Sequence, residues 1–403
     1  MKAAKARTLI ELAVLWGAAL AGAVVIIAFR GPAAMREAAE EVPEATAVAG
    51  DWPIFRGDRR LSGVADAPAP DEPALLWTRE TGGAVKSSPV VASGVVYIGS
   101  GNALHALDAA DGAAIWRFDA GAPVEAPPLV VGGVVYFGTL DGVFLALDAV
   151  EGSERWRFQG EGPITGSATW ADGEAGRRVI FGSHDSILYC LDAATGEEVW
   201  RAETGSYLLG PVTLADGTAL VGSCDAKIHA VAAANGSPLW QTGVDAYVTA
   251  GVAAAGGRGV VGHYGGEVVC VNLSDGSVVW KYGGGEGAEP FISSPAVMEG
   301  RVVIGSRDNS LHCVALDGGR PLWRFLARGE IDSSPVIAGK QVVVGSGDGR
   351  LYILDLDDGG ELWSYDCGSP ISSSPAVTAG MIVTAAEDGA VRAFGKPGKA
   401  AEE

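Results

Sequence analysis

Three histidines have the residue type and the placement that could make a metal site. His105, His229 and His312 occupy the same place in three copies of a recurring apolar segment, and neutral imidazole is a common ligand of transition metals. If each copy folds as its own unit, the three imidazoles are held apart from one another. We therefore expect these histidines to pack structurally, and we predict no metal site.

Aspartates recur in a similar way, in the second turn of six copies of the segment. A ring of carboxylates could bind cations, but an aspartate in a turn more often accepts hydrogen bonds from the backbone of that turn. We favour this capping role for Asp141, Asp185, Asp225, Asp308, Asp348 and Asp388.

The five cysteines indicate neither a disulfide framework nor a redox motif, because no two are adjacent and none forms Cys-x-x-Cys. Cys190, Cys270 and Cys313 fall at a small apolar position, whereas Cys224 and Cys367 fall in turns, where we expect greater exposure. No Ser/His/Asp set or pair of carboxylates can be placed, so we assign no catalytic residue.

The elements that must position these residues are repeats of about 40 residues. Tryptophans recur at spacings of 39 to 44 residues, and a glycine stands four residues before each of them except the first. A shared offset in seven copies indicates one repeated structural unit. These structural tryptophans are Trp77, Trp116, Trp156, Trp200, Trp240, Trp280, Trp323 and Trp363.

Each copy contains four short apolar runs, rich in β-branched and aromatic residues and bounded by Gly, Asp or Ser, as in residues 90–118. Such runs predict β-strands, and segments such as Asp108–Gly112 predict hairpin loops. Four strands repeated at this period are typical of a β-propeller blade. We expect the tryptophans to fill the gaps between neighbouring blades.

The last copy lacks its tryptophan strand, and a matching strand precedes the first copy. We therefore predict an all-β, eight-bladed propeller of four-stranded antiparallel blades over residues 74–395. Its last blade combines residues 74–80 with residues 371–394. This arrangement removes a free sheet edge and closes the ring.

The N-terminal segment predicts a membrane anchor. Residues 1–30 carry Lys2, Lys5 and Arg7 before an apolar run at 8–29, which as a helix would span ~33 Å, enough to cross a bilayer. The basic residues place its start in the cytoplasm and the propeller on the periplasmic, extracytoplasmic side of the cytoplasmic membrane, as a single-pass protein. A cleaved signal peptide and a secreted chain remain the alternative.

The segments that flank the predicted propeller have their own compositions. Residues 31–50, rich in Ala, Glu and Pro, predict a flexible tether, and residues 51–73 a strap lying on the propeller. Residues 396–403 predict a disordered tail. The Arg-Gly-Asp triplet at 56–58 is too short to indicate an adhesion motif.

The formal charge of −20 disfavours nucleic-acid binding, because an acidic surface repels phosphates. Function is expected in the linkers that enter the first strand of each blade, since these vary while the strands do not. Their mixed aromatic and acidic character suits a peptide or protein partner, although ordinary solvated loops are equally consistent with it. The candidate partner-face residues are Lys86, Glu125, Tyr207, Tyr247, Phe291, Glu330 and Asp332.

The repeat, with Val-Val-Tyr-Ile-Gly-Ser at 95–100, then Leu-Asp-Ala-x-x-Gly and Trp, resembles the PQQ-binding-like (quinoprotein) propeller repeat. Trp-Pro-x-Phe-Arg-Gly at 52–57 also resembles the strap before such repeats. The resemblance implies three branches: quinoprotein alcohol dehydrogenases, BamB-like outer-membrane assembly propellers, and sensor domains of membrane kinases. The dehydrogenase branch implies PQQ with calcium and a vicinal Cys-Cys disulfide, which this chain lacks.

The BamB-like layout is the nearest of the three, although the lipid-carrying Cys usual in that branch is missing. We therefore expect a membrane-anchored, monomeric, non-catalytic scaffold that binds an envelope protein or peptide and needs no cofactor. A PQQ- and calcium-dependent oxidoreductase and a ligand-sensing ectodomain are the alternatives.

Overall fold

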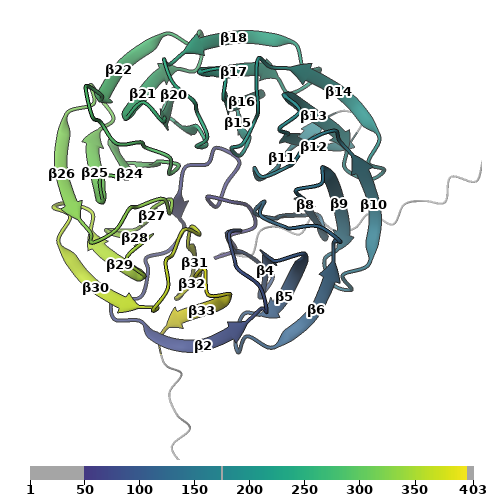
Figure 1. Cartoon of the computed structure of the whole chain (residues 1–403), viewed down its shortest axis with the longest axis horizontal. Helices are drawn as coiled ribbons and strands as arrows, with labels where there is room; N and C mark the ends of the chain where they lie inside the picture. Colours follow the sequence, from purple (N-terminus) through teal and green to yellow (C-terminus); the bar gives the residue numbers. More distant parts are fainter. Residues whose placement is uncertain (1–49, 174–175, 397–403) are drawn as a thin grey trace, which may run out of the picture. The chain divides into compact units, whose positions relative to one another are not determined.

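Eight β-sheets stand around a common axis like the blades of a propeller (Figure 1). A computed structural model of the chain describes residues 50–173 and 176–396, and all the regular elements in these ranges are β-strands. This confirms the predicted eight-bladed, all-β architecture. The predicted anchor at 1–30, the tether up to residue 49 and residues 397–403 of the predicted tail lie outside the described residues. No helix long and apolar enough to cross a membrane occurs within those described.

Blades 1 to 7 each run from a short inner strand to an outer strand, and neighbouring strands in a blade are antiparallel. The strands of the first four blades are β3 (Val90–Ala92), β4 (Val95–Ser100), β5 (Ala103–Asp108), β6 (Ala114–Asp119), β7 (Leu129–Val131), β8 (Val134–Gly138), β9 (Val143–Asp148), β10 (Glu154–Gln159), β11 (Thr169–Gly173), β12 (Gly176–Gly182), β13 (Ile187–Asp192), β14 (Glu198–Glu203), β15 (Thr213–Ala215), β16 (Thr218–Ser223), β17 (Lys227–Ala232) and β18 (Pro238–Gly243).

The remaining blades follow the same order around the ring. Their strands are β19 (Ala253–Ala255), β20 (Arg258–Gly262), β21 (Glu267–Asn272), β22 (Val278–Gly283), β23 (Ala296–Met298), β24 (Arg301–Gly305), β25 (Ser310–Ala315), β26 (Pro321–Leu326), β27 (Val336–Ala338), β28 (Gln341–Gly345), β29 (Arg350–Asp355), β30 (Glu361–Asp366), β31 (Ala376–Thr378), β32 (Met381–Ala385) and β33 (Ala390–Gly395).

The eighth blade takes its outer strand from the other end of the propeller. Strand β2 (Ala74–Glu80) pairs antiparallel with β33, with Trp77 opposite Ala393. In Figure 1, β2 lies outside β33 on the rim of the ring. Because β2 supplies the outer-strand tryptophan that the last repeat lacks, this sheet has the same strand order as the complete blades.

Seven of the eight blades are joined to the next by a tryptophan. The indole N–H of Trp156, on β10, donates to the carbonyl of Ala193 in the next blade at 3.1 Å. Its ring covers Gly196, where a Cβ atom would lie 2.6 Å from the ring. The same bond and the same glycine contact occur at the six other tryptophans Trp77, Trp116, Trp200, Trp240, Trp280 and Trp323.

Serine hydroxyls link five blades near the axis. The hydroxyl of Ser294 accepts from the backbone N–H of Gly251 at 2.8 Å, and Ser334, Ser374 and Ser88 continue the series, each accepting from the preceding blade at 2.9 Å. These bonds run from blade 5 through blade 8 to blade 1. They give a structural role to the serine that stands before proline in the linkers of blades 1, 6, 7 and 8.

The predicted strap crosses the inner strands at one end of the channel. Trp52 bridges to Val91 of blade 1, and Arg59 and Arg60 accept from backbone N–H groups of blades 4 and 5. The strap contains β1 (Val64–Ala65), which adds to β27 of blade 7 as a parallel fifth strand. Backbone hydrogen bonds thus tie this segment to blades around the ring.

Arg56, at the centre of the strap, is almost completely buried. Its guanidinium donates to the carbonyls of Pro335 and, at 2.9 Å, of Pro295, in neighbouring blades. Burial lowers the pKa of Arg56 to about 9, because the charged form loses its hydration. The Arg-Gly-Asp triplet therefore begins with a residue that is inaccessible to an adhesion receptor.

Two glycine substitutions test the tryptophan contact. Gly196 and Gly217 both have positive φ angles, of 75° and 79°, but only Gly196 lies under an indole; no heavy atom lies within 4 Å of the Cβ position at Gly217. We expect Gly217→Ala to cost about 1 kcal/mol through backbone strain alone. Gly196→Ala should cost about 3 kcal/mol, because Trp156 must also shift. Urea unfolding measures both, and equal losses would show that the indole contact contributes nothing.

Deletion of residues 71–81 tests the split blade. The deletion removes β2 and exposes the edge of β33, so we expect the single cooperative unfolding transition to be lost. Trp77→Phe is the control, since it keeps the strand and removes only the indole N–H bond; it should unfold cooperatively at a lower urea concentration. If the deleted chain melts like the intact one, β2 does not close the ring.

Candidate functional site

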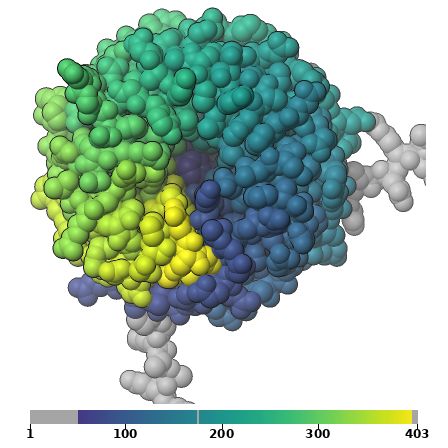
Figure 2. All heavy atoms as spheres, in the orientation of Figure 1, coloured from purple at the N-terminus to yellow at the C-terminus, as the bar shows by residue number. Residues whose placement is uncertain are grey.

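The linkers that enter the inner strands lie at the end of the channel opposite the strap. Figure 2 views the ring from the side on which a central hollow opens, with purple strap residues at its floor. We call this side the linker face. It consists of the linkers 81–89, 120–128, 160–168, 204–212, 244–252, 284–295, 327–335 and 367–375, together with the second hairpin turns that hydrogen-bond to them.

Aromatic residues mark the linker face at blades 4 and 5. The side chains of Tyr207 and Tyr247 are 56% and 58% exposed. Tyr207 stacks on His184, with ring centroids 5.9 Å apart. Tyr264, which the sequence analysis missed, is also exposed, and its backbone N–H donates to the carbonyl of Tyr247. The two predicted tyrosines are thus free to contact a partner, and Tyr264 lies beside one of them.

Acidic residues mark the face at blades 7 and 8. Glu330 and Asp332 line a pocket of about 270 Å³ with Ser372 and Glu387. Arg307 from blade 6 donates two hydrogen bonds to Asp332, at 2.9 and 3.1 Å, and lies 3.5 Å from Glu330. The bond to Asp332 raises the pKa of Arg307. One cation therefore serves two carboxylates here, and the pocket keeps an acidic character.

The three remaining candidates behave differently. Lys86 and Glu125 form an exposed ion pair at 3.2 Å between the first two linkers. Phe291 is only 4% exposed, because its ring packs against Tyr282 and His312 between blades 5 and 6. The prediction that Phe291 lies on a partner-binding rim is therefore wrong, since its apolar ring turns into the blade interface.

The three histidines lie on β5, β17 and β25 of separate blades, as predicted. The capping role is confirmed at Asp185, Asp308, Asp348 and Asp388, each of which accepts a backbone N–H from two residues ahead. These carboxylates have a second role that the sequence analysis missed: each binds the side chain four residues later. Such pairs, with Asp225 included, are Asp185–Tyr189, Asp225–His229, Asp308–His312, Asp348–Tyr352 and Asp388–Arg392.

All five cysteines are free thiols. Burial raises the pKa of Cys190 to about 12 and that of Cys270 to about 11, which leaves neither thiol reactive. Cys367, expected to be exposed, is buried, whereas Cys224 is half-buried. The backbone N–H of Cys367 donates to the carbonyl of Gly349 at 2.8 Å.

The described residues do not fit the quinone and calcium ion that the dehydrogenase branch implies. Asp332, at the acidic pocket, is already bound by Arg307. In residues 50–173 and 176–396 no group of three or more His, Cys, Asp or Glu side chains could hold a metal ion. The free cysteines belong to different blades or linkers, so they supply no vicinal disulfide.

Comparison with known proteins agrees with the repeat pattern. A family model described as "Outer membrane protein assembly factor BamB" matches residues 62–206, 168–230, 224–331 and 307–400. No curated protein sequence matches significantly.

Solved structures share the fold at low sequence identity. BamB from Moraxella catarrhalis is 18% identical, with a TM-score of 0.67, over 80% of this chain and 100% of that one. Quinohemoprotein alcohol dehydrogenase from Comamonas testosteroni is 17% identical, with a TM-score of 0.74, over 88% and 82%. The computationally designed Ika8 protein is 18% identical, with a TM-score of 0.70, over 80% and 99%. At these identities the likeness shows the fold alone.

His105 provides a pH test of its structural role. Burial, followed by the nearby Arg117 and Arg79, lowers the pKa of His105 to about 4, and its buried Nε2 has no hydrogen-bond partner among the described residues. The unfolded chain, with an ordinary histidine pKa near ~6.5, binds the proton first. Stability should therefore fall as pH drops from about 6.5 to about 4, by up to about 3 kcal/mol.

His105→Leu is the matched variant, because Leu145 holds the same position in blade 2. Urea unfolding at several pH values should show a smaller decline for this variant than for the native chain. Parallel declines would mean that His105 is not the group responsible.

Proposed function

The chain belongs to the family described as outer membrane protein assembly factor BamB, and on that premise we propose that it is a protein-binding scaffold of the cell envelope that catalyses no reaction itself. The observation that carries this proposal is the linker face. Exposed tyrosines and an acidic pocket surround one open end of the channel, while the strap occupies the other.

The chemistry of this face supports a protein partner. Tyrosine contributes large, rigid contact area and a hydroxyl group, and aromatic residues are enriched at the energetic centres of interfaces. Tyr207 and Tyr247 supply such area on one side of the hollow. The pocket lined by Glu330, Asp332 and Glu387 suits a lysine or arginine side chain of the partner.

The location of the protein is part of the same proposal. Residues 8–29 anchor the chain in the cytoplasmic membrane as a single span, with Lys2, Lys5 and Arg7 on the cytoplasmic side. The propeller then faces the periplasm, and β2 closes the ring as the chain leaves the strap.

Site-specific photocrosslinking tests the partner face. A photoreactive amino acid replaces Tyr207 in one variant and Val150 in another. Val150 is 79% exposed, but its turn lies at the strap end of the blade. We expect a discrete protein adduct in intact cells from position 207 and none from position 150. Equal labelling from both positions would argue against a specific linker-face partner.

Specificity is tested by combining the crosslinker at position 207 with Glu330→Gln. Because the acidic pocket would lose a charge, the adduct should decrease several-fold, whereas Asp216→Asn, an exposed change on the strap side, should leave it unchanged.

Reconstitution with PQQ and calcium distinguishes the scaffold from the oxidoreductase. We expect no reduction of an acceptor dye by alcohols or sugars in the presence of both. Quinone-dependent turnover that saturates with added PQQ would overturn the scaffold proposal.

A further inference from the structure

The outer strands carry a second recurring position, two residues after the tryptophan. In five blades an aromatic side chain at this position packs onto the next blade, as Phe158 does on Phe181 and Tyr189. Blade 3 has Ala202 instead. The five aromatic residues are Phe118, Phe158, Tyr282, Phe325 and Tyr365.

A groove of about 740 Å³ occupies the space beside Ala202, between blades 3 and 4. Its walls include Leu188 and Ala202 of blade 3 and Val221, His229 and Trp240 of blade 4. This volume is within the range of small-molecule and side-chain sites. The groove therefore lies where an inter-blade aromatic ring is present elsewhere in the same protein.

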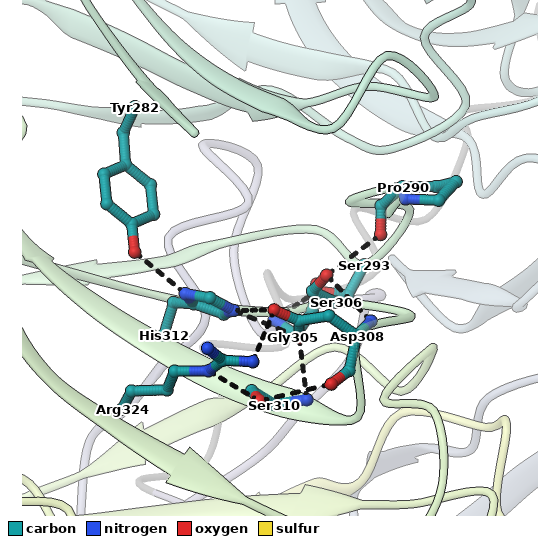
Figure 3. A network of polar contacts seen from close by, with 9 residues as sticks. All are labelled: Tyr282, Pro290, Ser293, Gly305, Ser306, Asp308, Ser310, His312 and Arg324. Atoms are coloured by element: carbon teal, nitrogen blue, oxygen red, sulfur yellow. Dashed lines mark hydrogen bonds and ion pairs between the residues drawn. The ribbon is translucent and has the colours of Figure 1, made fainter. Parts of the chain in front are cut away.

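Between blades 5 and 6 the equivalent space is filled by the side chain of Tyr282. Figure 3 shows the phenol of Tyr282 directed at His312, with 2.9 Å between the hydroxyl and Nδ1. The other ring nitrogen of His312 lies 3.0 Å from the carboxylate of Asp308. Because an ionised carboxylate only accepts, Nε2 donates to Asp308 and Nδ1 accepts from the phenol. Burial lowers the pKa of His312, which favours this neutral form.

Blades 3 and 4 repeat this arrangement without the phenol. His229 and His312 hold equivalent positions, because His229 is paired with Gln241 on the outer strand as His312 is paired with Arg324. The Nε2 atom of His229 lies 2.9 Å from the carboxylate of Asp225. Ala202 holds the position of Tyr282, because Ala202 is paired with Leu188 in blade 3 as Tyr282 is paired with Val268 in blade 5. The Nδ1 atom of His229 has no partner among the described residues.

A second polar atom at the groove is also unpartnered. One carboxylate oxygen of Asp225 is buried and accepts no hydrogen bond within the described part of the chain. In the filled site the corresponding Asp308 is bonded by Arg324 and by the backbone of Ser310. A buried acceptor without a donor is costly. The groove thus offers two unpartnered acceptors, and a phenol, with its single O–H, can meet the one on His229.

We propose that the groove between blades 3 and 4 binds the tyrosine side chain of a partner protein. The phenol ring takes the place that Tyr282 fills between blades 5 and 6, and its hydroxyl donates to Nδ1 of His229. The aromatic ring packs on Ala202, Val221 and Leu188.

A protein is the source of the phenol because the groove opens beside Leu239, which is 53% exposed and offers apolar contact to flanking residues. Arg201, which pairs with Glu198, and Lys227, 3.8 Å from Asp225, line the groove together with Glu203. The two cations are the groups that an acidic neighbour of the partner's tyrosine would contact. The choice of a protein rests on the proposed function, whereas recognition of the phenol does not. The site is separate from the linker-face tyrosines and adds a second contact for the partner.

The test uses the purified full-length chain in detergent with N-acetyl-tyrosinamide as the probe and N-acetyl-phenylalaninamide as its matched control. Binding is followed by NMR titration of the His229 ring signals. We expect saturable binding of the tyrosine probe, three- to tenfold tighter than the phenylalanine probe, as one added hydrogen bond provides. Absence of saturable binding, or equal binding of both probes, would overturn the proposal.

Two variants locate the site. Ala202→Tyr supplies the phenol internally and should abolish probe binding while raising the unfolding midpoint. Tyr282→Ala opens the corresponding place between blades 5 and 6 and should create a second equivalent of binding at His312. If Ala202→Tyr binds the probe as the native chain does, the groove is not the site.

His229→Val separates recognition of the hydroxyl from packing, because Val269 holds this position in blade 5. The variant should bind the two probes equally. A preference that survives this change would contradict the role of His229.

A final binding experiment tests whether the phenol comes from a protein. A tyrosine peptide flanked by acidic residues should bind more tightly than N-acetyl-tyrosinamide. Equal affinities would contradict the protein source and leave a free phenol as the ligand. Since none of these variants changes Tyr207, Tyr247 or the acidic pocket, their failure would leave the crosslinking result at Tyr207 unaffected.

Discussion

The contact between a tryptophan of one blade and a glycine of the next is the interaction on which the ring depends. The indole donates to a loop carbonyl and its ring lies on a glycine that no other residue type could replace without displacing it. A single four-stranded blade would expose both faces to water, so its stability comes from its neighbours. Repetition of one local contact at seven described junctions thus produces a closed object from a linear chain.

Two further devices act at the axis, where the tryptophans do not reach. Serine hydroxyls join the inner ends of blades 5 to 8 and blade 1, and the strap bonds to inner strands around the ring. Arg56 fixes the strap by donating to carbonyls of two blades. Because the strap occupies one end of the channel, the linkers at the other end are left to meet a partner, and the proposed scaffold function follows from this division.

The blade pattern also shows why related sites in one ring can differ in function. An aspartate in the second turn and a polar residue four positions later form a pair in several blades, and in most of them an aromatic ring from the preceding blade covers the pair. At Ala202 the ring is absent and a groove lies in its place, although Ala202 and Tyr282 hold equivalent positions in the register of their sheets. A repeat architecture can therefore acquire a binding site by deleting one side chain.

The sequence by itself determined the blade count, the strand order and the strand that completes the last blade, because these follow from periodic spacing and local turn chemistry at Trp77, Gly112 and their equivalents. It also predicted the separation of the three histidines. Only the tertiary structure decided that Phe291 and Cys367 are buried, that Arg56 lies at the axis, and that Ala202 faces His229. These relations join residues of different blades or of the strap, and the distances between such residues depend on how neighbouring sheets pack rather than on any pattern within one repeat.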